Sequence, residues 1–264
     1  MLRRAVGGGL ETAFARRIGG GLRSARLDEG GGGSGAAPDA PMTMQARGRF
    51  ITLEGGEGVG KSVQAKRLEE RLAALGLAVV RTREPGGSPG AEALREAILS
   101  GFAAEFNPAG QALLFAAARV DHLDKTILPA LARGAWVVSD RFADSTRAYQ
   151  GAAGNLPPDF IASLERLTVG ANEPDLTLIL DLDPEVGLER AAARRQTGAA
   201  DRFESEGLPF HKTLRRAFLD IAAAEPLRCA IIDADRSEDD VAAAIWSAVE
   251  SRLHPASALT AKLA

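Results

Sequence analysis

The segment GGEGVGKS, from Gly55 to Ser62, constrains this chain most, because it matches the phosphate-binding pattern G-x-x-x-x-G-K-[ST]. In this pattern, glycines let backbone N–H groups turn inward around phosphate oxygens, and the start of the following helix adds its positive dipole end. Lys61 can reach the β- and γ-phosphates, and the Ser62 hydroxyl can bind Mg²⁺. We expect a nucleotide-phosphate site made of Gly55, Gly56, Glu57, Gly58, Val59, Gly60, Lys61 and Ser62.

Short apolar segments alternate with helical ones along the rest of the chain. We expect strands at 50–54, 77–82, 136–140, 176–182 and 229–233, and helices at 63–75, 91–99, 108–133 and 241–253. Almost wholly apolar strands separated by helices are typical of a parallel sheet that is covered on both faces. The expected fold class is therefore α/β: a P-loop NTPase three-layer α/β/α fold with a five-stranded parallel sheet, helices on both faces and a short lid.

Composition argues against several other classes of protein. No apolar run approaches the roughly 18 residues that span a bilayer, so we expect no membrane partner. The single cysteine, Cys229, cannot form an internal disulfide, and the three histidines lie too far apart in sequence for a His/Cys zinc site. A net charge of −3 argues against a nucleic-acid partner. These features together predict a cytoplasmic protein.

The first 48 residues differ in composition from the remainder. They contain 12 of the 29 glycines, and seven arginines against four acidic residues. The stretch GGGGSGAAPDAP is typical of a flexible linker. We expect 1–48 to be a disordered basic leader or the product of a start assigned too early, with Met42 and Met44 just before the domain; a targeting peptide is a third interpretation. The folded domain is expected at 49–254, with a tail at 255–264.

The phosphate-binding loop alone leaves the reaction open. The base-reading motif N-K-x-D of GTPases and the L-S-G-G-Q signature are missing, and no D-x-x-G follows the loop. The folded part is also small for a motor ATPase, so a kinase that acts on a small molecule is the simplest interpretation. The strand WVVSD ends in Asp140, which is typical of a carboxylate that orients Mg²⁺.

Further segments resemble the bacterial thymidylate kinase family. They are the acid Glu57 in the loop (G-x-[DE]), TREPGGS at 82–88 (T-R-E-P-G-G-[TS]), FAAAR at 115–119 (F-x-A-x-R) and DRFADSTRAYQG at 140–151 (D-R-[FYHW]-x-x-S-x-x-A-Y-Q-G). The resemblance covers residues 49–253. It implies a dTMP kinase that transfers the γ-phosphate of ATP to dTMP, giving dTDP for dTTP biosynthesis, with Mg²⁺ as cofactor. It also implies a homodimer formed through helices.

The resemblance assigns roles at the acceptor end of the site. It implies that Arg83 and Arg141 hold the acceptor phosphate. Around the nucleoside it implies stacking of thymine on Phe115, contact of Arg119, Ser145 and Thr146 with the base edge, Tyr149 and Gln150 on the sugar side, Glu84 and Pro85 in the pocket wall, and Glu57 near the 3′-hydroxyl. Ordinary core packing is the alternative for Phe115 and Tyr149, and a plain surface position is the alternative for Arg83.

An arginine-rich segment at 190–204 is interpreted as a lid over ATP, the alternative being a solvated basic helix end. A phosphate acceptor is already anionic, so the transfer needs positive charge on the moving phosphoryl group more than it needs a base. In the family this charge comes from an arginine of the loop or of the lid, and here the loop position holds Gly58. We therefore expect Arg194, and as second choice Arg195, to be catalytic together with Lys61 and Arg141, and Arg202 to contact adenine or ribose.

Two other functions stay open. A deoxynucleoside kinase would phosphorylate a neutral hydroxyl and would need a carboxylate base beside it. Three arginines at the acceptor end, Arg83, Arg119 and Arg141, fit a charged acceptor better. A non-catalytic nucleotide-binding regulator is disfavoured by the intact Lys61 and Asp140.

Overall fold

The computed structural model describes residues 47–194 and 203–256, so most of the expected leader and tail, Arg195 and Arg202 lie outside the described residues. Five parallel strands form one sheet in the order β2-β3-β1-β4-β5. They are β1 (Phe50–Glu54), β2 (Val79–Arg83), β3 (Trp136–Asp140), β4 (Leu176–Asp181) and β5 (Cys229–Asp233). The expected sheet is confirmed, and only β2 begins later than the sequence predicts.

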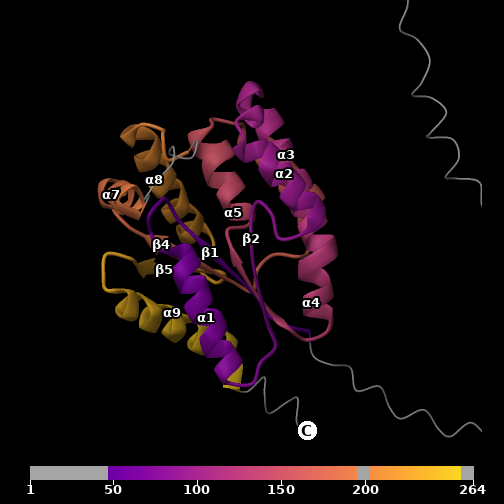
Figure 1. Cartoon of the computed structure of the whole chain (residues 1–264), viewed down its shortest axis with the longest axis vertical. Coiled ribbons are helices and arrows are strands. Elements are labelled where there is room, and N and C mark those ends of the chain that lie inside the picture. Colours follow the sequence, from indigo (N-terminus) through magenta and orange to yellow (C-terminus); the bar gives the residue numbers. More distant parts are fainter. Residues whose placement is uncertain (1–46, 195–202, 257–264) are drawn as a thin grey trace, which may run out of the picture. The chain divides into compact units, whose positions relative to one another are not determined.

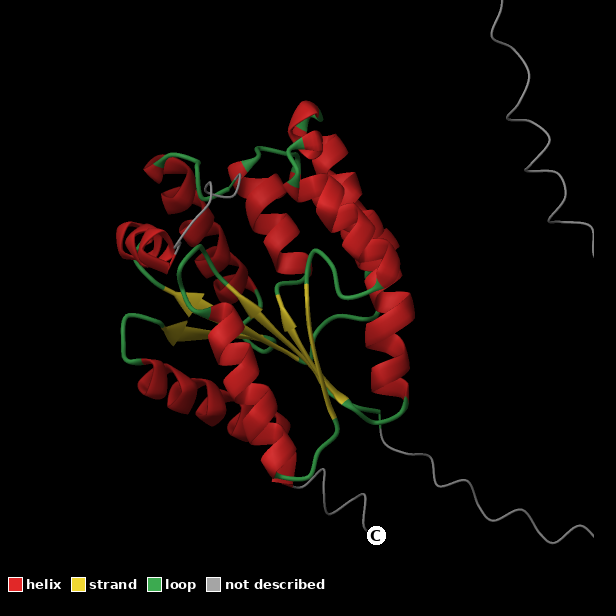
Figure 2. Cartoon of the chain, in the orientation of Figure 1, coloured by secondary structure: helices red, strands yellow, loops and turns green. Residues whose placement is uncertain are grey.

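Helices cover both faces of the sheet (Figures 1 and 2). On one face, α1 (Lys61–Ala74) packs beside α9 (Glu238–Leu253). The opposite face is covered by the π-helical turn η2 (Leu123–Ile127) with α4 (Leu128–Ala132), and by α8 (Leu208–Ala224). The other helical elements are α2 (Pro89–Leu99), η1 (Phe102–Glu105), α3 (Pro108–His122), α5 (Ala143–Thr146), η3 (Arg147–Ala153), α6 (Pro158–Thr168) and α7 (Pro184–Arg194). No helix in the described ranges is both long and apolar enough to cross a membrane.

The strands are apolar on both faces because alternate side chains point in opposite directions. In β1, Leu53 packs in the cluster formed with α1 and α9, whereas Phe50 packs with η2 and α4. In β4, Leu178 joins the first cluster and Ile179 packs against α8. This two-sided core explains why the strands are apolar without alternation in the sequence.

The single helix expected at 108–133 is interrupted in the structure. α3 ends at His122, and the π-helical turn η2 separates it from α4. Pro129 lies in the first turn of α4, where it has no N–H to donate to the preceding turn. Three further helices, α6, α7 and α8, were not expected from apolar periodicity, although each has a proline in its first turn, a common sign of a helix start: Pro158, Pro184 and Pro209.

The carboxyl ends of three strands bring chemistry-bearing residues to one edge of the sheet. In the strand register, Asp140 at the end of β3 pairs with Arg83 of β2 and with Leu53 of β1. Glu54 ends β1, and the phosphate-binding loop follows it directly. Ligands of open parallel sheets bind at this edge, so the fold itself positions the site.

Candidate active site

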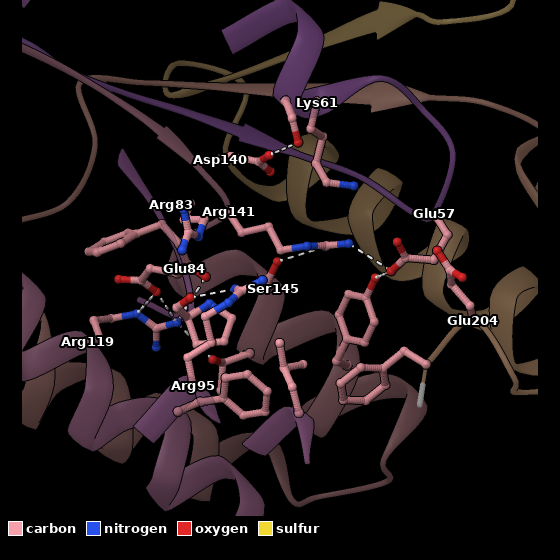
Figure 3. Close-up of a pocket in the computed structure, with 18 of the residues that line it drawn as sticks. Glu57, Lys61, Arg83, Glu84, Arg95, Arg119, Asp140, Arg141, Ser145 and Glu204 are labelled. Carbon is pink, nitrogen blue, oxygen red and sulfur yellow. Dashed lines mark hydrogen bonds and ion pairs between the residues drawn. The ribbon is translucent and has the colours of Figure 1, made fainter. Parts of the chain in front are cut away.

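A cleft of about 340 Å³ lies at the carboxyl edge of the sheet. Figure 3 shows side chains from distant parts of the chain pointing into it. It is lined by most of the residues expected from the sequence: Glu57, Gly58, Gly60, Lys61, Ser62, Arg83, Glu84, Pro85, Phe115, Arg119, Asp140, Arg141, Ser145, Thr146, Tyr149, Gln150 and Arg194. The remaining loop residues, Gly55, Gly56 and Val59, line a smaller cavity that also borders β4 and α8.

The donor end of the cleft is the phosphate-binding loop. Gly60 has a left-handed backbone (φ 89°), and α1 begins at the next residue, Lys61. The buried Lys61 ammonium donates to the carbonyl oxygens of Gly55 and Gly56 at 3.2 and 2.6 Å. Burial, followed by the nearby Arg141, lowers the pKa of Lys61 to about 8. The Lys61 ammonium thus lies against the phosphate-binding loop, where the two carbonyl oxygens hold it.

Two oxygen ligands suited to a hard cation meet beside this loop. The Ser62 hydroxyl donates to Asp140 Oδ2 at 2.5 Å, and this contact is exposed to solvent. Mg²⁺ is usually held by one or two carboxylates together with substrate phosphates and water, not by a cage of protein ligands. In the described ranges no group of three or more His, Cys, Asp or Glu residues could hold a metal. The pair therefore fits a Mg²⁺ ion that is shared with a nucleotide.

Gly58 is in contact with the backbone of the neighbouring helix α7. Its φ is 69°, and a Cβ at this position would lie 1.9 Å from the carbonyl oxygen of Gly187. A Cβ on Gly187 would in turn lie 2.5 Å from the carbonyl oxygen of Glu57. Because neither residue has room for a side chain, the loop cannot carry an arginine at this position without displacing α7.

Glu57 turns its carboxylate toward Arg141 and Tyr149. Arg141 Nη2 donates to Glu57 Oε1 at 2.8 Å, and the Tyr149 hydroxyl donates to the same oxygen at 2.5 Å. The Arg141 guanidinium also lies 5.0 Å from the centre of the Tyr149 ring. Burial would raise the pKa of Glu57, but Arg141, Lys61 and the Tyr149 hydroxyl outweigh it and lower that pKa to about 2. An ionised Glu57 therefore fixes the central arginine of the cleft.

Arg119 is the most buried arginine lining the cleft, with 4% of its surface exposed. Its Nε donates to Glu84 Oε2 at 2.8 Å, and its Nη2 donates to Phe142 O and Thr146 Oγ1 at 3.0 and 3.1 Å. Phe115 lies one turn earlier on α3 and also lines the cleft. These contacts anchor the Arg119 guanidinium. Because both residues belong to α3, the flat Phe115 ring and the charged Arg119 side chain line the same wall of the cleft.

Arg83 is less constrained than Arg119 and Arg141, the two arginines described above. Its side chain is half exposed, and its Nη2 lies 3.0 and 3.1 Å from the two carboxylate oxygens of Glu92. The next residue, Glu84, is buried and joined to Pro85 by a cis peptide bond. Glu84 thus lines the cleft and binds Arg119.

A family model described as thymidylate kinase matches residues 53–245, a range that contains every residue of the cleft. The chain belongs to the thymidylate kinase family. It is 56% identical over 216 residues to the thymidylate kinase of Bradyrhizobium diazoefficiens, covering 82% of this chain and 95% of that protein. It is 54% identical over 224 residues to that of Nitrobacter winogradskyi, covering 85% of this chain and 97% of that protein.

A crystal structure of the thymidylate kinase from Ehrlichia chaffeensis is similar to this fold. It superposes with a TM-score of 0.63 at 31% identity, covering 77% of this chain and 99% of that chain. The family membership and the P-loop NTPase fold expected from the sequence are therefore both confirmed.

Several residues of this thymidylate kinase cleft were not expected from the sequence. Arg95, the only basic residue of α2, lines the cleft and donates from Nη1 to Pro85 O at 2.7 Å. Phe203 and Glu204 line it from the segment before α8, and the Phe203 ring lies 5.0 Å from the Tyr149 ring. The single basic residue of α2 was an available signal for Arg95, whereas Phe203 lay in the expected lid segment 190–204 with no role of its own assigned.

Proposed function

We propose that this chain is a dTMP kinase that transfers the γ-phosphate of ATP to dTMP, giving dTDP. The observation that carries the proposal is the position of Arg141, which contacts the loop at Gly55 O (3.1 Å) and also lines the arginine-rich half of the same cleft. An arginine between the two ends suits a reaction in which two phosphate groups meet. Arg83 would add a second contact to the acceptor phosphate.

The state of Glu57 favours a phosphate acceptor over a neutral hydroxyl. A base for a 5′-hydroxyl works best with a pKa near the working pH, and the pKa of Glu57 is lowered to about 2 by the contacts described above. The Glu57 carboxylate is also occupied by Arg141 and Tyr149. It is thus poorly suited to remove a proton, and near the 3′-hydroxyl it would act as a hydrogen-bond acceptor.

At the donor end, Lys61 would exchange its carbonyl partners for the β- and γ-phosphates of ATP. Ser62 and Asp140 would hold Mg²⁺, which when bound neutralises charge on these phosphates. Arg194, the last residue of α7, is exposed and lines the cleft, which supports its proposed contact with the phosphoryl group in transit. Arg195 and Arg202 keep their proposed roles as the second lid arginine and an adenine or ribose contact.

The thymine would stack on Phe115, and its edge would face Arg119, Ser145 and Thr146. Tyr149 would lie against the sugar, where an aromatic ring leaves no room for a 2′-hydroxyl, and Gln150 would close the same side. Burial, then Glu57, raise the pKa of Tyr149 well above its ordinary value despite the opposing charge of Arg141. The hydroxyl therefore stays protonated and continues to donate to Glu57.

Turnover on a panel of acceptors tests the proposal. ADP release is measured with ATP and Mg²⁺ against dTMP, dUMP, dCMP, dGMP, dAMP and thymidine. We expect dTMP to give the highest kcat/KM. Thymidine as the best acceptor would make the protein a deoxynucleoside kinase, and ATP binding without turnover on any acceptor would make it a nucleotide-binding regulator.

We also propose that the protein is a homodimer formed through helices. Apolar side chains are exposed on α3 (Leu113, 53%, and Val120, 45%) and on the adjacent α6 (Leu167, 84%). A second copy would bury such side chains. Sedimentation equilibrium should give twice the chain mass, and a monomer at micromolar concentration would contradict the proposal.

A further inference from the structure

Glu54 is a fully buried carboxylate with no role in the proposed chemistry. It ends β1, directly before the phosphate-binding loop, and none of its surface is exposed. A buried carboxylate is costly unless hydrogen bonds satisfy it. Glu54 Oε1 accepts from the backbone N–H groups of Phe142 (2.7 Å) and Ser145 (3.3 Å), and Oε2 accepts from the Ser145 hydroxyl (2.7 Å). All three donors belong to the segment after β3, so β1 is tied to a part of the chain distant in sequence.

This segment contains Arg141, whose backbone adopts a rare conformation. Its φ of 73° lies in the left-handed region, which costs a non-glycine residue about 1–2 kcal/mol and persists only where neighbouring contacts hold it. The Arg141 N–H donates to Leu53 O at 2.9 Å, its carbonyl accepts from the Ser139 hydroxyl at 2.8 Å, and the next N–H, that of Phe142, binds Glu54. Glu54 thus supplies one of the contacts that fix the main chain at Arg141.

Glu54 also reaches the Arg141 guanidinium through a shared hydroxyl. Arg141 Nη1 donates to Ser145 Oγ at 3.2 Å, and Ser145 Oγ donates to Glu54 Oε2. A guanidinium can only donate and a hydroxyl has one proton, so the carboxylate sets the direction of this chain of hydrogen bonds. Burial, followed by the nearby Asp144, raises the pKa of Glu54 to about 7, whereas the Ser145 hydrogen bond and Arg141 oppose that rise.

An amide in place of the carboxylate could not satisfy the same three donors. The two backbone N–H groups need an oxygen on one side, and the Ser145 hydroxyl needs an oxygen on the other. Glutamine offers one oxygen and one NH₂ group, so either Ser145 loses its acceptor or an NH₂ faces two N–H donors. The Glu54→Gln substitution therefore keeps the volume of the side chain and changes only one hydrogen-bond acceptor into a donor.

We propose that Glu54 is a positioning residue for the acceptor phosphate: acting through Ser145 and the Phe142 N–H, it holds the Arg141 guanidinium in the cleft. The inference rests on the proposed function, because it takes the acceptor to be dTMP. Lys61 and Ser62, which form the donor end, make no hydrogen bond to Glu54, and the charge of Glu54 supports the Lys61 ammonium less than the charges of Glu57 and Asp140 do. Loss of the carboxylate should therefore impair the acceptor more than ATP.

The test is a double-mutant cycle with Glu54→Gln, Ser145→Ala and the double variant, measured as KM for dTMP and KM for ATP at about pH 8.5, where a carboxyl with a pKa of about 7 is ionised. We expect each single variant to raise KM for dTMP about tenfold and KM for ATP less than twofold, in line with the loss of one hydrogen bond to a charged group. The double variant should be no worse than about the poorer single variant, because both changes break the same chain of bonds.

Thr52→Val is the matched control. Thr52 lies in the same strand, is equally buried and bonds Thr177 Oγ1 at 2.8 Å outside the cleft. It should leave both KM values unchanged. Should Glu54→Gln fail to fold, Glu54→Asp, which keeps the charge and withdraws it by one methylene, must show the same selective rise in KM for dTMP.

Three results would overturn the inference: an unchanged KM for dTMP in a folded Glu54 variant, an equal rise in both KM values, or single effects that multiply in the double variant. The wild-type protein separates this failure from that of the proposed function. If the wild type does not phosphorylate dTMP, the proposed function and the acceptor role of Glu54 are both wrong. If it does, an unselective Glu54 variant refutes only the positioning role.

Discussion

The two ends of the cleft are built differently. At the acceptor end, Arg119 is held by the buried carboxylate of Glu84, and Arg141 by the partly buried carboxylate of Glu57. At the donor end, Lys61 rests on carbonyl oxygens of its own loop, and Arg194 is exposed at the end of α7. Carboxylates of the protein itself thus hold the guanidinium groups at the acceptor end, whereas the contacts of the donor end are ones that ATP would replace. Organisation in advance lowers the entropic cost of placing the acceptor phosphate.

This contrast predicts that donor-end variants lose rate without losing stability. Lys61→Ala should lower kcat/KM by about 1000-fold, because it removes a charge that acts on the phosphates in the transition state. The free energy of unfolding should not fall, since the variant also removes a buried charge. Steady-state kinetics and urea denaturation measure the two quantities. Lys66→Ala, in the same helix with a side chain 65% exposed, is the control and should match the wild type.

Acceptor-end variants should lose stability as well as affinity. Arg119→Leu leaves the buried Glu84 carboxylate without its arginine, which should cost about 3 kcal/mol of unfolding free energy. Arg83→Leu is the comparison, because its partner Glu92 is exposed and such pairs contribute less than about 1 kcal/mol. Urea denaturation of both variants decides the point. Equal losses would mean that burial does not distinguish the two arginines.

Variants at the carboxyl end of α7, where the expected lid begins, should lower kcat and leave KM for dTMP nearly unchanged. Arg194→Ala should lower kcat about 100-fold and change KM for dTMP less than threefold, the signature of a contact made only in the transition state. Arg190, one turn earlier, donates to Ala234 O and Asp235 and does not line the cleft, so Arg190→Ala is the matched control. A larger loss of kcat in Arg195→Ala than in Arg194→Ala would assign the role to Arg195.

The smallest expected effect is a dependence of stability on pH at Glu54. Burial and Asp144 raise the pKa of Glu54 from 4.5 to about 7, so its stabilising contribution is complete below pH 4.5 and is lost as the pH rises through 7. Glu54→Gln cannot ionise. Its unfolding free energy relative to the wild type should therefore increase by about 2 kcal/mol between pH 5 and pH 8. A constant difference across this range would show that the pKa is not raised.

The sequence predicted the parts of the site that depend on local motifs. The loop glycines, Lys61 and Asp140 follow from patterns in which one segment carries the whole signal, and the apolar strands predicted the sheet that brings them together. Glu54 was missed because its partners lie 88 and 91 residues away in the chain. A carboxylate at the end of an apolar strand is a signal for a buried partner, but only the fold reveals which donors meet it.

Helix boundaries that depend on packing could not be predicted from the sequence either. The interval 108–133 is continuously helical in its periodicity, and the π-helical turn at Leu123–Ile127 depends on how Pro129 and the sheet are accommodated. The pairing of Arg119 with Glu84 could likewise not be predicted, since both residues had plausible roles toward substrate. Only the structure shows that the two side chains are buried together and form an ion pair.

The contact between Gly58 and Gly187 limits how the enzyme can evolve. An arginine that served the transition state from the loop would have to enter where a Cβ already lies 1.9 Å from a backbone oxygen. A single substitution at this position therefore damages the loop before it can supply a useful charge. An arginine at this loop position would require α7 to move first, so Gly58 should persist for as long as the α7 backbone lies this close to the loop.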